Sequence, residues 1–394
     1  MGGHGGIRDK RYFVLRVYGS QILVVSFGQL LEILKTIRSR DRRQEQIEAF
    51  FSATRREFPI VEGDSVYFVY KGEVLFGIGV AGDMNNWDTR SHPMESIPMT
   101  DLHYLRCQFP SNARIEYKFV KDGAWIVDPL NLKTCTGEIG LNSFLTMPEY
   151  SEPPQYALQG THRGRSCSHS FESDLLRTRV DLGVHFPAPA VDAETCSLLC
   201  VLDGEKFKRY AQVDLVCHLH NAQEETEKVI LALIDFEHSR DLKESRLISR
   251  MIIEEVLPFI GSSYPVDKKL SARALLGASF LGVIPFLTVL ESPGAFGKVG
   301  CMSGYLGRSG GAIIQDFLSR SRLELKVYMS CGTFETNIGG AGSFIDSARL
   351  MHEALMSRGY DVLYEESPEG HSWFSRRARL ISLFRFFFSG SKAL

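Results

Sequence analysis

The sequence has little excess charge and no paired cysteines. Among its 394 residues, 45 Lys and Arg stand against 47 Asp and Glu, for a formal net charge of -2. Without a basic excess, the composition does not indicate nucleic acid or an anionic membrane as a partner. The 8 cysteines form no CxxC pair, whereas metal frameworks require thiolates or histidines at short spacing. We therefore expect reduced cysteines and no metal site.

Long apolar runs are missing as well. Residues 17–31 are uncharged and follow several basic residues, as in a signal peptide. They are fewer than the ~20 apolar residues of a membrane-spanning helix, and no small-x-small cleavage site follows them. We therefore expect a cytoplasmic protein, with export as the alternative. The hydrophobic share of 44% is ordinary for globular proteins and excludes wholesale disorder, collagen and coiled coil.

The first 173 residues change character twice. From Gln29 to about Arg56 apolar residues recur at helical spacing, so residues 1–60 are interpreted as an N-terminal extension with an amphipathic helix. Residues 61–150 alternate polar and apolar positions in short runs separated by Gly, Asn and Asp, which is typical of a small β-sandwich. Residues 151–173 are polar, rich in Ser, Pro and Gly, and are interpreted as a linker.

Residues 174–394 alternate apolar strand-like runs with helical patterns. Continuous apolar strands between helices predict an α/β fold with a mostly parallel sheet covered on both faces. Helical patterns include Ser245–Phe259 and Ser343–Arg358, and the last helix is so apolar that it is either buried against the sheet or part of a homodimer contact. The predicted strands are Thr178–Phe186, Ser197–Leu202, Val229–Ile234, Ala272–Gly277, Lys298–Met302, Leu325–Ser330 and Asp361–Glu365.

A candidate nucleophile lies where the strand Ala272–Gly277 runs into a helical pattern. The segment between them, residues 277–282, is GASFLG. A serine at a tight strand-to-helix turn is exposed above the sheet, with a helix N-terminus behind it. The backbone N–H of Phe280 would then point at a developing oxyanion. The pattern predicts Ser279 as the nucleophile, although a G-x-S match alone is a weak signal.

Two more groups follow later strands. Glu335 comes just after the strand Leu325–Ser330, and His371 lies in the loop after Asp361–Glu365. In doubly wound sheets ligands sit outside the carboxyl ends of the strands, so Ser279, Glu335 and His371 should converge on one edge. A serine hydroxyl needs an imidazole to take its proton, and the imidazole needs a carboxylate to fix its tautomer. The order serine, acid, histidine is that of α/β-hydrolases. Asp346 and Asp361 are the alternative acids.

Several segments resemble, in order, those of the enterochelin esterase and esterase D group of α/β-hydrolases, which includes bacterial feruloyl esterases. The resemblance covers about residues 179–388. It implies an α/β-hydrolase domain over residues 174–394 and a serine esterase that works through an acyl-enzyme without metal or organic cofactor. The segments are LDGE at 202–205, ID at 234–235, HSRDL at 238–242, EEVLP at 254–258, VGCMSG at 299–304, GTFE at 332–335 and GHSW at 370–373.

The resemblance also implies roles for individual residues. The backbone of Gly204 or Glu205 is expected to complete the oxyanion hole with Phe280. Arg240 is expected to bind an anionic substrate group such as a catecholate or carboxylate, or else to form an ion pair with a neighbouring acid. The remaining expected substrate contacts are Ser303 and Trp373.

The sandwich carries a resemblance of its own. Residues 82–87 (GDMNNW) and 114–125 (RIEYKFVKDGAW) resemble the early-set immunoglobulin-like modules of glycogen-active enzymes, which are carbohydrate-binding modules. Similar modules precede the hydrolase in enterochelin esterases. Trp87 and Trp125 are either exposed for stacking on sugar rings or aromatic acids, or core anchors of the sandwich.

The predicted function is hydrolysis of carboxylic esters. The expected substrate is a small-molecule or glycan-linked ester, either a siderophore trilactone or a feruloyl or other aryl ester. One alternative is an acyltransferase, in which an alcohol intercepts the acyl-enzyme. The other is a non-catalytic carbohydrate-binding or regulatory protein with a degenerate hydrolase domain, suggested by Leu281 where the family's turn has glycine.

Overall fold

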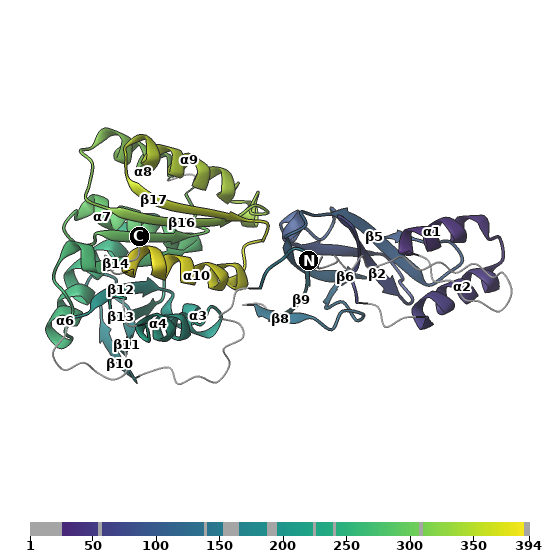
Figure 1. The fold of residues 1–394 in the computed structure, drawn as a ribbon, viewed down its shortest axis with the longest axis horizontal. Helices are drawn as coiled ribbons and strands as arrows, with labels where there is room; N and C mark the ends of the chain where they lie inside the picture. Colours follow the sequence, from purple (N-terminus) through teal and green to yellow (C-terminus); the bar gives the residue numbers. More distant parts are fainter. Residues whose placement is uncertain are drawn as a thin grey trace, which may run out of the picture. The chain divides into compact units, whose positions relative to one another are not determined.

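The computed structural model describes residues 26–53, 57–137, 140–152, 165–186, 195–223, 226–238, 242–306 and 310–389. The chain forms two compact units. The first runs to Tyr150, apart from residues 136–138, and the second continues from Ser151. Figure 1 labels elements of both units. Within the described ranges, no helix combines the length and apolarity needed to cross a membrane.

The first unit contains two antiparallel sheets, as the alternating pattern predicted for a sheet-rich region. The sheets pack face to face: the ring of Phe68 in β2 meets that of Tyr117 in β6 edge to face, with centroids 4.7 Å apart. One sheet has the order β1 (Ile60–Glu62), β2 (Ser65–Lys71), β5 (Leu102–Gln108), β4 (Glu95–Ser96). The other has the order β3 (Ile78–Gly82), β6 (Arg114–Lys121), β9 (Gly140–Thr146), β8 (Thr134–Gly137), with β7 (Ala124–Ile126) paired to β6.

Two helices replace the single amphipathic helix that the sequence predicts. They are α1 (Phe27–Thr36) and α2 (Arg40–Ser52), whose N-terminal N–H groups are capped by Ser26 and Ser39. Serine at this position starts a new helix because its hydroxyl accepts an otherwise unpaired amide. Both helices pack on the first sheet, so they belong to the core of this unit and not to an extension. Their buried residues are Phe27, Leu30, Leu31, Leu34, Ile47 and Phe50.

The two tryptophans of the first unit lie side by side near its surface. Their ring centroids are 6.3 Å apart at an interplanar angle of 35°. Trp125 is 46% exposed, so it is not a core anchor. Trp87 is half-buried, and its indole Nε1 donates a hydrogen bond to Asp83 at 3.2 Å.

The second unit is built on an eight-stranded sheet. Strands β10, β11 and β13 are antiparallel neighbours, and all later pairs are parallel, which confirms the predicted mostly parallel α/β sheet. The order across the sheet is β10 (Arg165–Glu172), β11 (Arg179–Phe186), β13 (Val229–Phe236), β12 (Ser197–Leu202), β14 (Arg273–Ala278), β15 (Lys298–Met302), β16 (Lys326–Gly332), β17 (Asp361–Ser367).

Strand β10 corrects the predicted linker, of which residues 165–172 are part of the sheet. All eight residues of β10 pair with β11. The strand lies at the sheet edge and most of its side chains are exposed. An edge strand with both faces largely in solvent has no apolar periodicity for a sequence pattern to reveal.

Helices cover both faces of this sheet (Figure 1). One face carries α3 (Gly204–Arg209), α4 (Val213–Asn221) and α10 (Trp373–Phe388). Of the two alternatives for the apolar last helix, burial against the sheet accounts for Leu380, Leu383, Phe384, Phe387 and Phe388. Helix α4 includes His218 and His220. The other face carries α5 (Leu242–Met251), a π-helical turn (Ile252–Val256), α6 (Leu257–Ser263), α7 (Ile284–Glu291), α8 (Gly310–Ser319) and α9 (Phe344–Ser357).

A buried ion pair lies inside the first unit. Arg114 Nη1 is 2.8 Å from Glu116 Oε1, and the two side chains are 1% and 6% exposed. The neighbouring carboxyl of Asp83 is also buried, and its burial, together with the charge of Glu116, raises the pKa of Asp83 to about 8. The guanidinium of Arg114 is therefore the positive charge that balances the buried carboxyl groups of Glu116 and Asp83.

Replacing Arg114 with methionine should destabilise the first unit by about 3–5 kcal/mol, because a buried carboxylate loses its counter-charge. The measurement is urea unfolding followed by tryptophan fluorescence in a Trp373→Phe background, so that only the first unit reports. Arg106→Met removes an exposed arginine of β5 and should change stability by no more than about 0.5 kcal/mol. Equal losses in the two variants would contradict the assignment.

Candidate active site

The turn after β14 has a strained backbone. Ser279 directly follows the strand and has φ 54°, in the left-handed region, before a 3₁₀ turn (Ser279–Val283) leads into α7. A Cβ at Gly277 would lie 2.1 Å from the carbonyl oxygen of Leu281, and one at Gly282 would lie 2.7 Å from Gly304 Cα. Both positions therefore require glycine for the turn to close.

Leu281 does not line the site. Its side chain is 1% exposed and packs in the core on the α7 face of the sheet. The close approach in this turn is made by Gly282, one residue later. The substitution that suggested a degenerate hydrolase is thus accommodated in the core.

The same backbone conformation recurs at three adjacent places. Asp203, Ser279 and Ser303 directly follow β12, β14 and β15, and their φ angles are 54°, 54° and 49°. These strands are parallel neighbours, so their carboxyl ends share one edge. Three left-handed residues turn three loops at that edge, which is where doubly wound sheets bind ligands.

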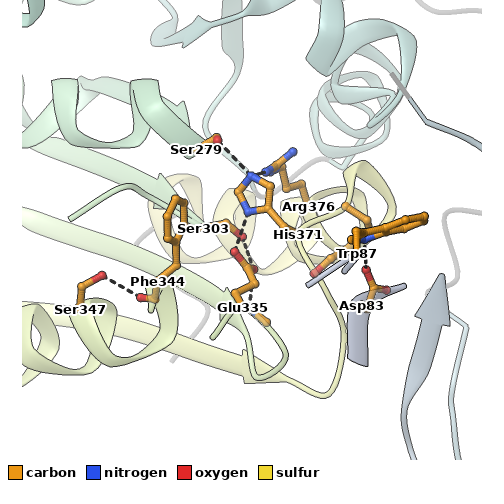
Figure 2. A network of polar contacts seen from close by, with 12 residues as sticks. Asp83, Trp87, Ser279, Ser303, Glu335, Phe344, Ser347, His371 and Arg376 are labelled. Atoms are coloured by element: carbon orange, nitrogen blue, oxygen red, sulfur yellow. Dashed lines mark hydrogen bonds and ion pairs between the residues drawn. The ribbon is translucent and has the colours of Figure 1, made fainter. Parts of the chain in front are cut away.

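The structure brings the three predicted catalytic side chains together (Figure 2). Ser279 Oγ is 3.0 Å from His371 Nε2, and His371 Nδ1 is 2.6 Å from Glu335 Oε2. The alternative acids Asp346 and Asp361 are both exposed, at the start of α9 and of β17. The hydrogen-bonded order serine, imidazole, carboxylate is the arrangement that activates a serine hydroxyl.

Backbone pairing places the acid beside the histidine. Strands β16 and β17 stay paired as far as Gly332 and Ser367. Beyond that point Phe334 N donates to Glu369 O at 3.3 Å, so the two loops remain joined. A Cβ at Gly332 would lie 2.3 Å from the same carbonyl oxygen, so only glycine allows this approach.

Glu335 is fully buried and accepts several hydrogen bonds. Its Oε1 accepts from Ser303 Oγ at 2.6 Å and from Gly332 N at 2.8 Å, while Oε2 faces His371. Burial alone would raise the pKa of this carboxyl, but the charge and hydrogen bond of His371, with the other donors, hold it below the usual value. Glu335 is therefore ionised and accepts hydrogen bonds without donating any.

Two expected substrate contacts lie elsewhere, and a third is not described. Ser303 is 3% exposed and its hydroxyl is directed to Glu335, so it orients the acid and does not face a substrate. Trp373 is 7% exposed and packs in the core, stacked on Tyr210 with ring centroids 5.9 Å apart. Arg240 lies outside the described residues.

Arg376 of α10 also reaches the site. Its Nη2 is 2.8 Å from His371 Nε2, and its guanidinium carbon is 4.7 Å from the ring centroid of Trp373 (Figure 2 labels the arginine and the histidine). The residue is 4% exposed. It follows Trp373 by three positions on α10, so one face of the helix carries both residues.

The oxyanion-hole candidates differ in their surroundings. Phe280 directly follows Ser279 in the turn, as expected for an oxyanion donor. The N–H of Glu205 donates to both oxygens of Asp235, at 2.9 and 3.1 Å, so this amide already has a carboxylate partner. Gly204 begins α3 and sits close against β13, where a Cβ would meet Leu233 at 2.4 Å. The geometry therefore favours Phe280, with Gly204 as the second position.

His238, the first residue of the segment HSRDL that carries part of the family resemblance, also lies at this edge, although the sequence assigned it no role. Its ring stacks on that of Phe280, with centroids 5.8 Å apart and an interplanar angle of 8°. Its Nε2 lies 3.9 Å from Asp203 Oδ1. His238 and Asp203 thus border the turn that carries Phe280.

A polar cavity of about 410 Å³ lies at the amino ends of the strands, at the opposite end of the sheet from Ser279. Across the described part of the chain, no three His, Cys, Asp or Glu side chains are grouped so as to hold a metal ion. Residues lining the cavity are Thr195, Ser197, Thr226, Glu227, Lys228, Asp267, Lys269, Ser271 and Ala272.

Solved structures with the same fold include two enterobactin esterases. The enzyme from Shigella flexneri, crystallised in the presence of enterobactin, matches with a TM-score of 0.68 and 18% identity over 86% of this chain and 97% of its own. The ferric enterobactin esterase of Salmonella typhimurium matches with a TM-score of 0.69 and 17% identity over 86% and 98%. A match of this extent cannot be contained in the second unit alone.

Comparison of sequences finds one relative that matches over part of its length and one family model that matches more than half of this chain. The uncharacterized Bacillus subtilis protein YbbA is 25% identical over 111 residues, which make up 28% of this chain and 44% of YbbA. The match thus spans less than half of that relative's length. The esterase family model matches residues 173–387, which include Ser279, Glu335 and His371. The chain belongs to the esterase family.

Proposed function

We propose that the protein hydrolyses carboxylic esters with Ser279 as nucleophile. The observation that carries the proposal is the hydrogen-bonded series Ser279, His371 and Glu335, with contacts of 3.0 and 2.6 Å. Membership of the esterase family supports the same activity. The strained turn that exposes Ser279 at the sheet edge is consistent with this use.

The proposed reaction has two halves. Ser279 Oγ attacks the ester carbonyl while His371 Nε2 takes the hydroxyl proton, and the N–H groups of Phe280 and Gly204 stabilise the oxyanion. The C–O bond to the alcohol breaks, the alcohol leaves with the proton from His371, and an acyl-serine remains. Water then gives a proton to His371 and attacks the acyl-serine. The bond between Ser279 Oγ and the acyl carbon breaks, His371 returns the proton to Oγ, and the acid is released. Glu335 keeps the imidazole oriented in both halves.

The proposed substrate is an ester of an aromatic acid or a siderophore-type trilactone. Its support is the fold likeness to two enterobactin esterases over 86% of the chain. We also propose that the first unit is an immunoglobulin-like module that accompanies the hydrolase, as the segments around Trp87 and Trp125 suggest. The exposure of Trp125 is consistent with a binding role for that module.

Ser279→Ala should lower turnover of p-nitrophenyl acetate by at least about 10³-fold, because the acyl-enzyme cannot form. Labelling by a fluorophosphonate probe should be lost as well. The matched control is Ser319→Ala, which removes an exposed hydroxyl on α8 and should leave both readouts unchanged. Equal rates for wild type and Ser279→Ala would end the proposal.

Ser303→Ala should lower kcat roughly tenfold, because Glu335 loses one of the donors that orient it and hold it ionised. Since that donor lowers the pKa of Glu335, its loss raises the pKa, and the acid side of the kcat/KM profile should move to higher pH. Glu335→Gln should cost more, about 10³–10⁴-fold, because the imidazolium loses its counter-charge.

The control for these variants is Ser347→Ala. This buried hydroxyl donates to the backbone oxygen of Phe344 at 2.9 Å, and no hydrogen bond links it to Glu335. Its loss should leave the pH profile where it is. A profile that moves equally in Ser347→Ala and Ser303→Ala would show a general effect of packing and contradict the role given to Ser303.

A substrate panel tests the substrate class. Wild type should hydrolyse feruloyl and catecholate-lactone esters with kcat/KM at least tenfold above that for acetylated xylan, when acid release is followed for all three. The reason is that only the first two offer an aromatic acyl group. A preference for acetylated xylan would contradict the substrate class and leave the esterase activity itself intact.

A further inference from the structure

Two donors meet one acceptor at His371. Glu335 is ionised and accepts from Nδ1, so that nitrogen carries the proton and Nε2 has the lone pair. Arg376 Nη2 lies 2.8 Å from Nε2, and Ser279 Oγ lies 3.0 Å from it. A guanidinium can only donate, so it uses the same lone pair that must take the proton of Ser279.

The position of Arg376 is built into the fold. Its guanidinium rests on the ring of Trp373 at 4.7 Å, and Trp373 is fixed by Phe207 and Tyr210, with ring centroids 5.1 and 5.9 Å away. The residue is 4% exposed, so water screens its charge poorly. Ser279 and His371 themselves are only half-buried.

The contact opposes the first step of the reaction. When Nε2 takes the proton of Ser279, His371 becomes positive, and a guanidinium 2.8 Å away would face a second cation. A hydrogen bond to Arg376 also lowers the availability of the lone pair. The reaction therefore requires that the guanidinium be drawn off Nε2 or be neutralised where it stands.

We propose that Arg376 selects esters that carry an anionic oxygen near the scissile carbonyl. The anion accepts the guanidinium N–H groups and so frees Nε2 for Ser279. Arg376 remains protonated throughout, and the only proton that moves in this first step is that of the Ser279 hydroxyl. The inference rests on the proposed esterase function and adds its substrate class: acyl groups with a carboxylate or phenolate oxygen, the geometry that a guanidinium binds with two parallel hydrogen bonds.

Two pairs of esters matched in size provide the test. 4-Nitrophenyl butyrate and mono-4-nitrophenyl succinate differ by a terminal carboxylate. 4-Nitrophenyl benzoate and 4-nitrophenyl 2,3-dihydroxybenzoate differ by the catechol oxygens, and this second pair is assayed at alkaline pH, where a phenol oxygen of the catechol is ionised. Rates are corrected with Ser279→Ala as the blank. Wild type should prefer the anionic member of at least one pair by tenfold or more in kcat/KM. The pair that responds tells which anion is recognised.

Arg376→Gln should remove the preference for the anionic ester. The kcat/KM for the preferred anionic ester should fall at least tenfold, the change that one charge-assisted hydrogen bond produces. For the neutral ester of the same pair kcat should stay equal or rise with KM unchanged, since Nε2 is no longer shared. Arg376→Lys keeps the charge and should retain part of the preference. Arg377→Gln removes the next arginine on α10 and should leave kcat/KM unchanged for both esters.

Three results would overturn the inference. The first is a wild type that prefers the neutral member of both pairs or shows no preference. The second is an Arg376→Gln variant in which kcat/KM falls equally for both members of a pair. The third is an Arg376→Gln variant in which kcat/KM falls for neither member. Wild-type preference is read without any variant, so a variant that fails to fold does not stop the test. Failure of the esterase proposal is distinct, because Ser279→Ala would then match wild type on every ester.

Discussion

Where a parallel strand ends at the carboxyl edge of the sheet, the backbone must turn sharply at the next residue if the side chain of that residue is to lie at this edge. In this protein the turn is made by non-glycine residues in the left-handed region: Asp203, Ser279 and Ser303, each directly after its strand. Each such residue costs roughly 1–3 kcal/mol and persists only where its surroundings hold it. Here the loops hold one another, since Tyr305 N donates to Ser279 O at 2.8 Å and Ser303 N donates to Ser330 O at 2.7 Å.

The polar side chains at this edge form a directed series of hydrogen bonds. Donors from Ser303 and Gly332 fix one oxygen of Glu335, the other oxygen takes Nδ1–H of His371, and Nε2 is left to accept. Each hydrogen bond therefore determines which atom carries the proton in the next hydrogen bond of the series. The tautomer of His371 thus follows from the buried carboxylate at one end and the guanidinium at the other.

The sequence predicted the parts of this fold that carry strong patterns. Strands Ser197–Leu202 and Lys298–Met302 have the predicted bounds because they are buried along their whole length and end at turns. Edge strand β10 was missed because its side chains are mostly exposed. Motif order located Ser279, Glu335 and His371, since loops at strand ends converge on one edge whatever the packing. It did not locate Arg376, because spacing shows which residues share a helix face but not what that face meets.

Helix α10 belongs both to the site and to the core. Its first turn places Arg376 against His371 with Trp373 packed behind the guanidinium, and its later turns bury Leu380, Leu383 and Phe384 in the core. A shift of the helix along the sheet would therefore move the guanidinium relative to Nε2 and disturb the packing together. His371 lies two residues before this helix, so only a short stretch of loop joins its imidazole to the element that carries the guanidinium. That short connection explains how an arginine that takes no part in bond making keeps a 2.8 Å contact with the nitrogen on which the proposed reaction depends.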